Sequence, residues 1–190
     1  MASHVPIALA AVALAWLPVG GEASAAPEPS PTTVDVRRGS VAGGTLGSSR
    51  GELEATFGPP LDQGRMLPNT PDGVSVEEIG LPWTLGPLPG VNMAKTFTMR
   101  YRGMTVDLAP SKGAYVFYVW RPRARTRGGV QIGDSLESVA SRHPSLRCGV
   151  RNQNSEYVSY PYCKGRIGRT HVWFGQDPVR SITISRASLH

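Results

Sequence analysis

The stretches Leu46-Gly47-Ser48-Ser49 and Ile132-Gly133-Asp134-Ser135 each place a glycine turn just before a small polar residue that can cap a helix. A short amphipathic run follows in each case, and it stops at Gly58 in the first segment and at Pro144 in the second. Gly47 and Gly133 lie 86 residues apart. Two segments of the same design indicate one supersecondary unit used twice, so the sequence predicts a tandem repeat.

Strand patterns follow each predicted helix. Residues 96–101 and 104–108 alternate with period two, and residues 114–120 are rich in aromatic and β-branched side chains, which indicates an antiparallel meander. After the second helix, residues 171–174 and 179–185 show the same preference. In each segment, a helix is followed by antiparallel strands. This order predicts an α+β fold in which two tandem helix-plus-antiparallel-sheet repeats form a two-layer sandwich.

The ends and linkers of these repeats follow from composition. Residues 1–25 are largely apolar and end in Ala23-Ser24-Ala25, which predicts a cleaved signal peptide. The leader has no Lys or Arg, so an uncleaved anchor or a misassigned start codon is the alternative. The rest is predicted to comprise a Pro-rich disordered tether (26–40), a first repeat (41–120) with a long Pro/Gly-rich insertion (61–92), an Arg-rich linker (121–128) and a second repeat (129–190).

The chain has two cysteines, Cys148 and Cys163. In a secreted protein they are predicted to form a disulfide, which would close a loop of 15 positions and stabilise the fold by about 3 kcal/mol. A two-cysteine metal site is the alternative, but no His or acidic cluster stands at ligand spacing. The sequence therefore predicts an extracellular protein without a metal or cofactor.

The charge of the chain is unevenly distributed. The formal net charge is +6, but residues 26–120 sum to −1 and residues 121–190 sum to +8. Such an excess of Lys and Arg attracts anionic partners over long distances. The predicted partners are a protein or an anionic cell-envelope polymer, while nucleic acid is an alternative that the sequence does not favour. The mature protein is expected to be a monomer without a membrane span.

Two groups of residues are candidate binding sites. Arg121, Arg123, Arg125 and Arg127 stand at spacing two, which would point four guanidinium groups to one side of an extended chain. A solvated linker, or an edge strand whose charges deter pairing, is the alternative. The second group is Tyr157, Tyr160, Tyr162 and Trp173, with Trp83 in the long insertion. Tyr and Trp anchor many contacts to proteins and sugars, although plain sheet packing also explains them.

The sequence contains no phosphate-binding loop of the Gly-x-x-x-x-Gly-Lys-Ser/Thr type and no His-Glu-x-x-His. The alternative is a small secreted basic hydrolase, nuclease-like, that uses His143 or His171. The two histidines could form its acid–base pair, with Lys164 or Arg169 as a cationic stabiliser. His143 also occupies a core-facing or helix-terminal position, where a packed imidazole is the ordinary outcome. The sequence therefore favours a binding protein over an enzyme.

The helix start and stop elements at residues 47–58 and 133–144, in a chain with a predicted signal peptide, resemble the β-lactamase inhibitory protein family. That family shares its repeat unit with the small outer-membrane assembly lipoproteins. The resemblance implies a two-repeat α+β fold and a role as a protein inhibitor. However, the one candidate disulfide lies in the second copy, and no segment matches the family's inhibitory loops, so no inhibitory residue is transferred.

The second copy is also similar to segments of secreted actinobacterial proteins of unknown function. Together these features predict a secreted, non-catalytic binding protein, either a protein inhibitor or a cell-envelope binding module.

Overall fold

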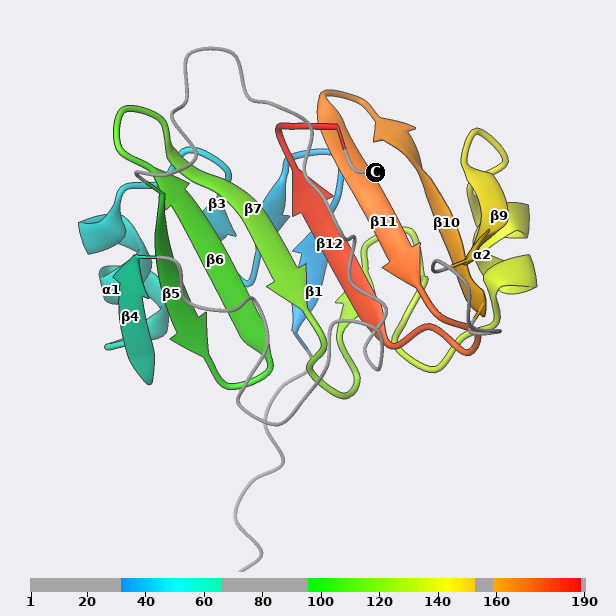
Figure 1. The fold of residues 1–190 in the computed structure, drawn as a ribbon, viewed down its shortest axis with the longest axis horizontal. Coiled ribbons are helices and arrows are strands. Elements are labelled where there is room, and N and C mark those ends of the chain that lie inside the picture. Colours follow the sequence, from blue (N-terminus) through cyan, green and yellow to red (C-terminus); the bar gives the residue numbers. More distant parts are fainter. Residues whose placement is uncertain (1–31, 66–95, 153–158, 189–190) are drawn as a thin grey trace, which may run out of the picture. The chain divides into compact units, whose positions relative to one another are not determined.

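An eight-stranded antiparallel sheet is the largest element of the fold (Figure 1), as seen in a computed structural model that describes residues 32–65, 96–152 and 159–188. All of these residues belong to one unit, Pro31–His190. The strand order is β4-β5-β6-β7-β12-β11-β10-β9. The strands are β4 (Asp62–Arg65), β5 (Phe97–Tyr101), β6 (Met104–Ala109), β7 (Gly113–Val119), β9 (Arg147–Asn152), β10 (Ser159–Ile167), β11 (Thr170–Gly175) and β12 (Ser181–Ser185).

A second, smaller sheet and two helices lie on one side of the large sheet (Figure 1). The small sheet has the order β3-β2-β1-β8, from β1 (Thr33–Asp35), β2 (Ser40–Val41), β3 (Gly44–Thr45) and β8 (Arg125–Thr126). The helices are α1 (Arg50–Phe57) and α2 (Leu136–Arg142). Their buried side chains share one core with those of the large sheet; this core includes Val34, Val41, Leu53, Val139, Met99, Phe117, Phe174 and Ile184. Within the described part of the chain, no helix has the length and apolarity needed to cross a membrane.

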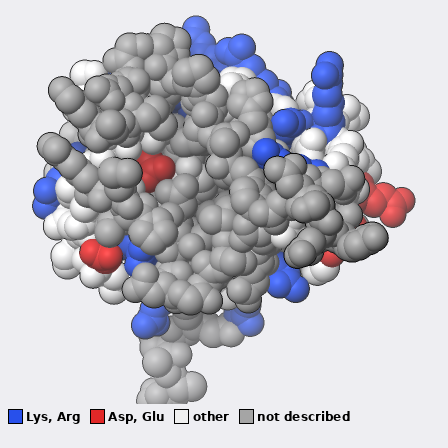
Figure 2. All heavy atoms as spheres, viewed as in Figure 1, with Lys and Arg blue, Asp and Glu red and all other residues white. Residues whose placement is uncertain are grey.

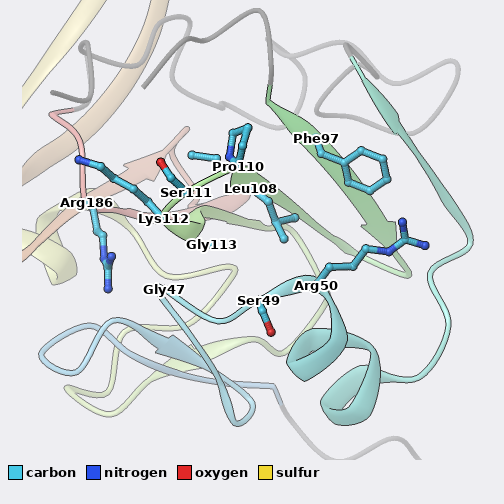
Figure 3. Close-up of a pocket in the computed structure, with 11 residues that line it drawn as sticks. Gly47, Ser49, Arg50, Phe97, Leu108, Pro110, Ser111, Lys112, Gly113 and Arg186 are labelled. Atoms are coloured by element: carbon cyan, nitrogen blue, oxygen red, sulfur yellow. The ribbon is translucent and has the colours of Figure 1, made fainter. Parts of the chain in front are cut away.

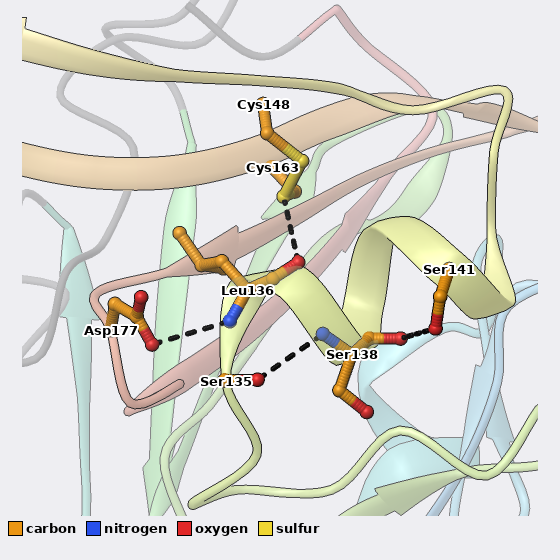
Figure 4. The surroundings of a disulfide bond; sticks show 7 residues. All are labelled: Ser135, Leu136, Ser138, Ser141, Cys148, Cys163 and Asp177. Atoms are coloured by element: carbon orange, nitrogen blue, oxygen red, sulfur yellow. Dashed lines mark hydrogen bonds between the residues drawn. A yellow bond between two sulfur atoms is a disulfide. The ribbon is translucent and has the colours of Figure 1, made fainter.

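Both helices start at the polar residues that follow the glycine turns. The Ser49 N–H donates to Glu52 Oε2 at 2.6 Å, and the Glu52 N–H donates back to Ser49 Oγ at 3.4 Å, which forms a capping box. The Ser138 N–H donates to Ser135 Oγ at 3.2 Å at the start of α2 (Figure 4). Asp177, in the turn between β11 and β12, accepts the Leu136 N–H at 3.2 Å. The two helix starts are therefore as the sequence predicts.

The predicted α+β sandwich of two tandem repeats is wrong. The structure is mostly β, and β7 pairs with β12, so the strands of the two predicted repeats lie in one sheet. The physical reason for this difference is that the two helices are short and bury few side chains. With eight and seven residues, α1 buries only Leu53, and α2 buries only Leu136 and Val139. Because neither helix can cover a sheet of its own, the small β sheet supplies the rest of the layer over the core.

Some predicted boundaries also need correction. The tether predicted for residues 26–40 extends too far, because Val34 of β1 is fully buried and residues 33–41 belong to the small sheet. The linker predicted for residues 121–128 includes β8, which pairs in parallel with β1. The insertion predicted for residues 61–92 starts with β4. The rest of that insertion and the predicted signal peptide lie outside the described residues.

Other local predictions are confirmed. The meander predicted for residues 96–120 is β5-β6-β7, and the strands predicted around the turn at residues 175–178 are β11 and β12. Cys148 and Cys163 form a disulfide across directly paired positions of β9 and β10 (Figure 4). The Cys163 sulfur lies 3.7 Å from the carbonyl oxygen of Leu136, so the bond sits under the start of α2. Because β9 is the edge strand of the large sheet, the disulfide ties that edge to β10.

The face of the large sheet opposite the core contains a buried carboxyl group. Asp107 of β6 accepts a hydrogen bond from Thr98 Oγ1 at 2.8 Å, and the Tyr118 hydroxyl also bonds to it. Burial raises the pKa of Asp107 from 3.8 to about 6, although these two hydrogen bonds act in the opposite direction. The ionised form therefore carries a desolvation cost in the folded protein.

This shift predicts how Asp107 affects stability as a function of pH. The folded state binds its proton more tightly than the unfolded chain, so the contribution of Asp107 falls as the pH rises from 3.8 to about 6 and is constant above that. The change amounts to roughly 3 kcal/mol. Urea unfolding of wild type and Asp107→Asn across this window should show the variant gaining stability relative to wild type as the pH rises. A difference that does not vary with pH would contradict the raised pKa.

Candidate functional site

A cavity of about 780 Å³ opens beside the start of α1 (Figure 3). Four segments that are distant in sequence line it: the loop before α1 with the first residue of that helix, the start of β5, the end of β6 with the turn to β7, and the residue that follows β12. Three of these segments contribute one cation each, namely Arg50, Lys112 and Arg186. Lys112 and Arg186 lie on one side of the cavity, and Arg50 lies on the other side with Phe97 (Figure 3). We call this site the basic cavity.

Two glycines allow the segments of the basic cavity to meet. Gly113 has a φ of +66°, and a Cβ atom at this position would overlap the carbonyl oxygen of Gly47. The Gly47 N–H donates to the Ala114 carbonyl at 2.7 Å, and the Ala114 N–H donates to the Ser48 carbonyl at 2.7 Å. The loop before α1 is therefore bonded directly to the first residues of β7.

The side chain of Arg186 is held over the same loop. Its Nη2 atom donates to the Leu46 carbonyl at 2.7 Å, and a Cβ atom on Gly47 would lie 2.5 Å from Nη2. Gly47 thus leaves the space that the guanidinium occupies. A guanidinium fixed by one hydrogen bond still presents other N–H donors to a ligand.

The electrostatics of the basic cavity favour an anion. Arg50 donates to Glu54 at 2.8 Å and lies over the Phe97 ring, with its Cζ 5.2 Å from the centroid. Glu54 does not line the cavity, and no Asp or Glu is found among its described lining residues. Charge-assisted bonds from Arg and Lys to carboxylate or phosphate are among the strongest hydrogen bonds in proteins. The arrangement can therefore hold a carboxylate or a phosphate group.

A second cavity, of about 520 Å³, lies between the β1–β2 turn and the end of α2. Five of its lining residues are basic: Arg37, Arg38, Arg127, Arg142 and His143. Asp35 neutralises part of this charge, since its Oδ2 lies 3.2 Å from Arg127 Nε and 3.9 Å from Arg38 Nε. We call this site the arginine cavity.

The two candidate catalytic histidines lie on opposite faces of the large sheet. His143 caps the end of α2, as a helix-terminal residue, and its ring stacks on Phe174 with centroids 6.3 Å apart. Burial, together with the charges of Arg142 and Arg37, lowers the pKa of His143. Phe174 faces the core, whereas His171, three residues earlier on β11, points to the other face. The two imidazoles therefore do not form the acid–base pair of the hydrolase alternative.

The described part of the predicted aromatic site forms a cluster on the face opposite the core. The rings of Tyr162 and Trp173 stack with centroids 4.3 Å apart, and Lys164 Nζ lies 5.3 Å and 5.6 Å from the two centroids. Burial and the charge of Arg151 lower the pKa of Lys164. Tyr160 and Trp173 are only 9% and 2% exposed, which favours sheet packing. Tyr157 and Trp83 lie outside the described residues.

The arginine run does not form the one-sided array that its spacing predicts. Arg123 adopts a φ of +65° in a turn, which breaks the extended chain after Arg121. Arg121 donates to Thr32 Oγ1 at 3.4 Å, Arg125 lies in the edge strand β8, and Arg127 lines the arginine cavity. The edge-strand alternative therefore describes Arg125, and only Arg127 joins a cationic site.

Sequence reasoning missed the basic cavity as a site, although it identified the glycine turn at residues 46–49. Residues 46–49 and 110–113 both have turn composition. Their meeting depends on where β7 starts and on the hydrogen bonds between Gly47, Ser48 and Ala114, which no local pattern indicates. Among the residues with described placement, no group of three or more His, Cys, Asp or Glu side chains could hold a metal ion.

Comparisons with known proteins do not assign a function to this site. No family model matches the chain, and no curated protein matches it. The crystal structure of a DUF4309 family protein (YjgB) from Bacillus subtilis subsp. subtilis str. 168 is similar over 74% of this chain and 80% of that chain, with 12% sequence identity and a TM-score of 0.38. A likeness at this level supports no argument about function.

Proposed function

We propose that the protein is a secreted, non-catalytic binding protein that holds an anionic group of its partner in the basic cavity. The observation that supports this most strongly is the placement of Arg50, Lys112 and Arg186 around one cavity by three separate segments. The partner is a protein or an anionic cell-envelope polymer, whose carboxylate or phosphate groups match these cations.

The geometry of Arg186 favours tight and selective binding. Its hydrogen bond to Leu46 and its seat over Gly47 order the side chain before any ligand arrives. A pre-ordered side chain loses less conformational entropy on binding, which improves affinity. Arginine is not deprotonated in proteins, so this residue supplies charge and hydrogen bonds rather than proton transfer.

The proposed secretion is supported by the disulfide between Cys148 and Cys163. Disulfides persist in oxidising compartments and are rare in the reducing cytosol. A partner outside the cell is consistent with the leader predicted at residues 1–25.

Pyrophosphate is a suitable probe for the basic cavity. In calorimetric titrations at low ionic strength, wild type is expected to bind pyrophosphate and Arg186→Gln to bind it about tenfold more weakly, because one charge-assisted hydrogen bond is lost. Arg102→Gln is the matched control. Arg102 is an exposed arginine in the β5–β6 turn, so this substitution removes the same charge at a position away from the basic cavity. Absence of binding, or equal weakening in both variants, would overturn the proposal.

A further inference from the structure

We infer that the basic cavity is one part of a longer strip that binds an extended, flexible polymer of phosphate groups. The strip comprises six exposed cations at one end of the large sheet, which we call the basic end: Arg37, Arg38, Lys112, Arg166, Arg169 and Arg186. This inference rests on the proposed anion binding and specifies the kind of ligand.

Strand register places the basic end at a single edge of the molecule. Lys112 lies in the turn that joins β6 to β7. Ser185, just before Arg186, pairs with Val116 near the start of β7 and with His171 near the start of β11. Arg169 lies in the β10–β11 turn, two residues before His171. These three cations therefore leave the sheet at the same end.

Direct contacts join the turns of the basic end into one surface. The Leu46 N–H donates to the Gly39 carbonyl at 2.7 Å, and Leu46 also accepts the hydrogen bond from Arg186. A Cβ atom on Gly39 would lie 3.1 Å from Thr170 Oγ1, and one on Gly168 would lie 3.7 Å from the Arg37 carbonyl oxygen. The β1–β2 turn is therefore packed between the loop before α1 and the β10–β11 turn.

The turns of the basic end contain no acidic residue. The four segments are residues 36–39, 110–113, 166–170 and 185–188, and none of them includes Asp or Glu. Figure 2 shows blue Lys and Arg side chains along the upper edge of the view, with no red side chain among them. Asp35, directly before the β1–β2 turn, is a carboxylate that approaches this edge, with its Oδ2 3.9 Å from Arg38 Nε. The four segments themselves add none, and the edge adjoins the arginine cavity through Arg37 and Arg38.

The length of the basic end indicates a polymer rather than a small anion. The β6–β7 and β10–β11 turns are three strand spacings apart in the sheet order, or roughly 14 Å. Arg186, at the end of β12, lies midway, about 7 Å from each turn. A single phosphate or carboxylate group is too small to contact all three positions, whereas a chain of phosphates contacts them in succession.

The residue types favour recognition of phosphates rather than bases. Proteins that bind single-stranded nucleic acid combine basic grooves with aromatic side chains on which bases stack. The four segments of the basic end contain no Phe, Tyr or Trp. Phe97 lines the basic cavity, but the Arg50 guanidinium lies over its ring. Charge is therefore the main recognition chemistry of the strip, and it fits a phosphate polymer of the cell envelope.

The test compares a long-chain linear polyphosphate with pyrophosphate as ligands of the full chain. The strip variant replaces Arg38, Arg166 and Arg169 with Gln and leaves the basic cavity intact. The control variant replaces Arg102, Arg123 and Arg180 with Gln; these exposed arginines lie in connections at the opposite end of the strands. The strip variant should bind polyphosphate about tenfold or more weakly than wild type, with a salt slope of log K smaller by about 2. It should still bind pyrophosphate like wild type.

The outcomes separate this inference from the proposed function. If wild type binds pyrophosphate but does not bind polyphosphate more tightly, the anion site in the basic cavity is supported and the inference of a longer strip is wrong. If the strip and control variants lose the same affinity for polyphosphate, the effect comes from net charge alone, and the inference of a strip is also wrong. Tighter binding of an oligothymidylate with the same number of phosphates would identify nucleic acid instead. Circular dichroism and melting curves that match wild type show that each variant is folded.

Discussion

Replacing Gly113 with alanine is expected to lower the free energy of unfolding by about 3 kcal/mol and to abolish pyrophosphate binding in the basic cavity. The left-handed φ of +66° alone costs about 1 kcal/mol for alanine. The new Cβ would also displace the Gly47 carbonyl, which breaks the two backbone bonds that join the loop before α1 to Ala114. Each lost bond costs about 1 kcal/mol.

Gly129→Ala is the matched control for this prediction. Gly129 also has a positive φ, +87°, but a Cβ atom there meets nothing within 4 Å. This variant should lose only about 1 kcal/mol and keep its affinity for pyrophosphate. Urea unfolding measures the stabilities, and calorimetry measures binding. Equal losses in the two variants would show that the contact with Gly47 does not matter.

Removal of the disulfide is expected to have a similarly large effect. The double variant Cys148→Ala, Cys163→Ala should unfold with a free energy about 3 kcal/mol lower than wild type, because the bond closes a loop with a sequence separation of 15. Among the described strands, β9 is at the edge of the large sheet and has β10 as its one neighbour, so the loss of stability is expected at β9 first. Hydrogen exchange should therefore rise in residues 147–151 before it rises in β11 and β12.

Reduction of the wild-type protein provides the control for the disulfide. A thiol reductant should lower the melting temperature of wild type and leave that of the double variant unchanged. An unchanged wild-type melting temperature, with reduction confirmed by thiol titration, would show that the bond adds no stability.

Local features of this fold could be predicted because their causes lie within a few residues. Ser49 and Ser135 cap helices through bonds to residues three positions later, and alternation alone marks β5 and β6. The disulfide followed from two cysteines in a chain expected in an oxidising compartment. Each of these inferences needs only neighbouring residues or a simple count.

The layer architecture and the basic cavity depend on contacts between distant segments. Val119 and Ile182 pair across 63 positions, and this pairing joins the strands of the two predicted repeats in one sheet. Val34 is buried in a segment whose proline-rich flank is typical of a tether. Arg186 and Leu46 are 140 positions apart, yet their hydrogen bond helps to build the cavity. Periodicity and composition contain no information on such pairs.

The titration of pyrophosphate into wild type, Arg186→Gln and Arg102→Gln tests the central claim most directly. The account predicts binding by wild type and by the Arg102 variant, about tenfold weaker binding by the Arg186 variant, and a loss of affinity in all three at high salt. Binding that is the same in the Arg186 and Arg102 variants, or that does not respond to salt, would contradict it.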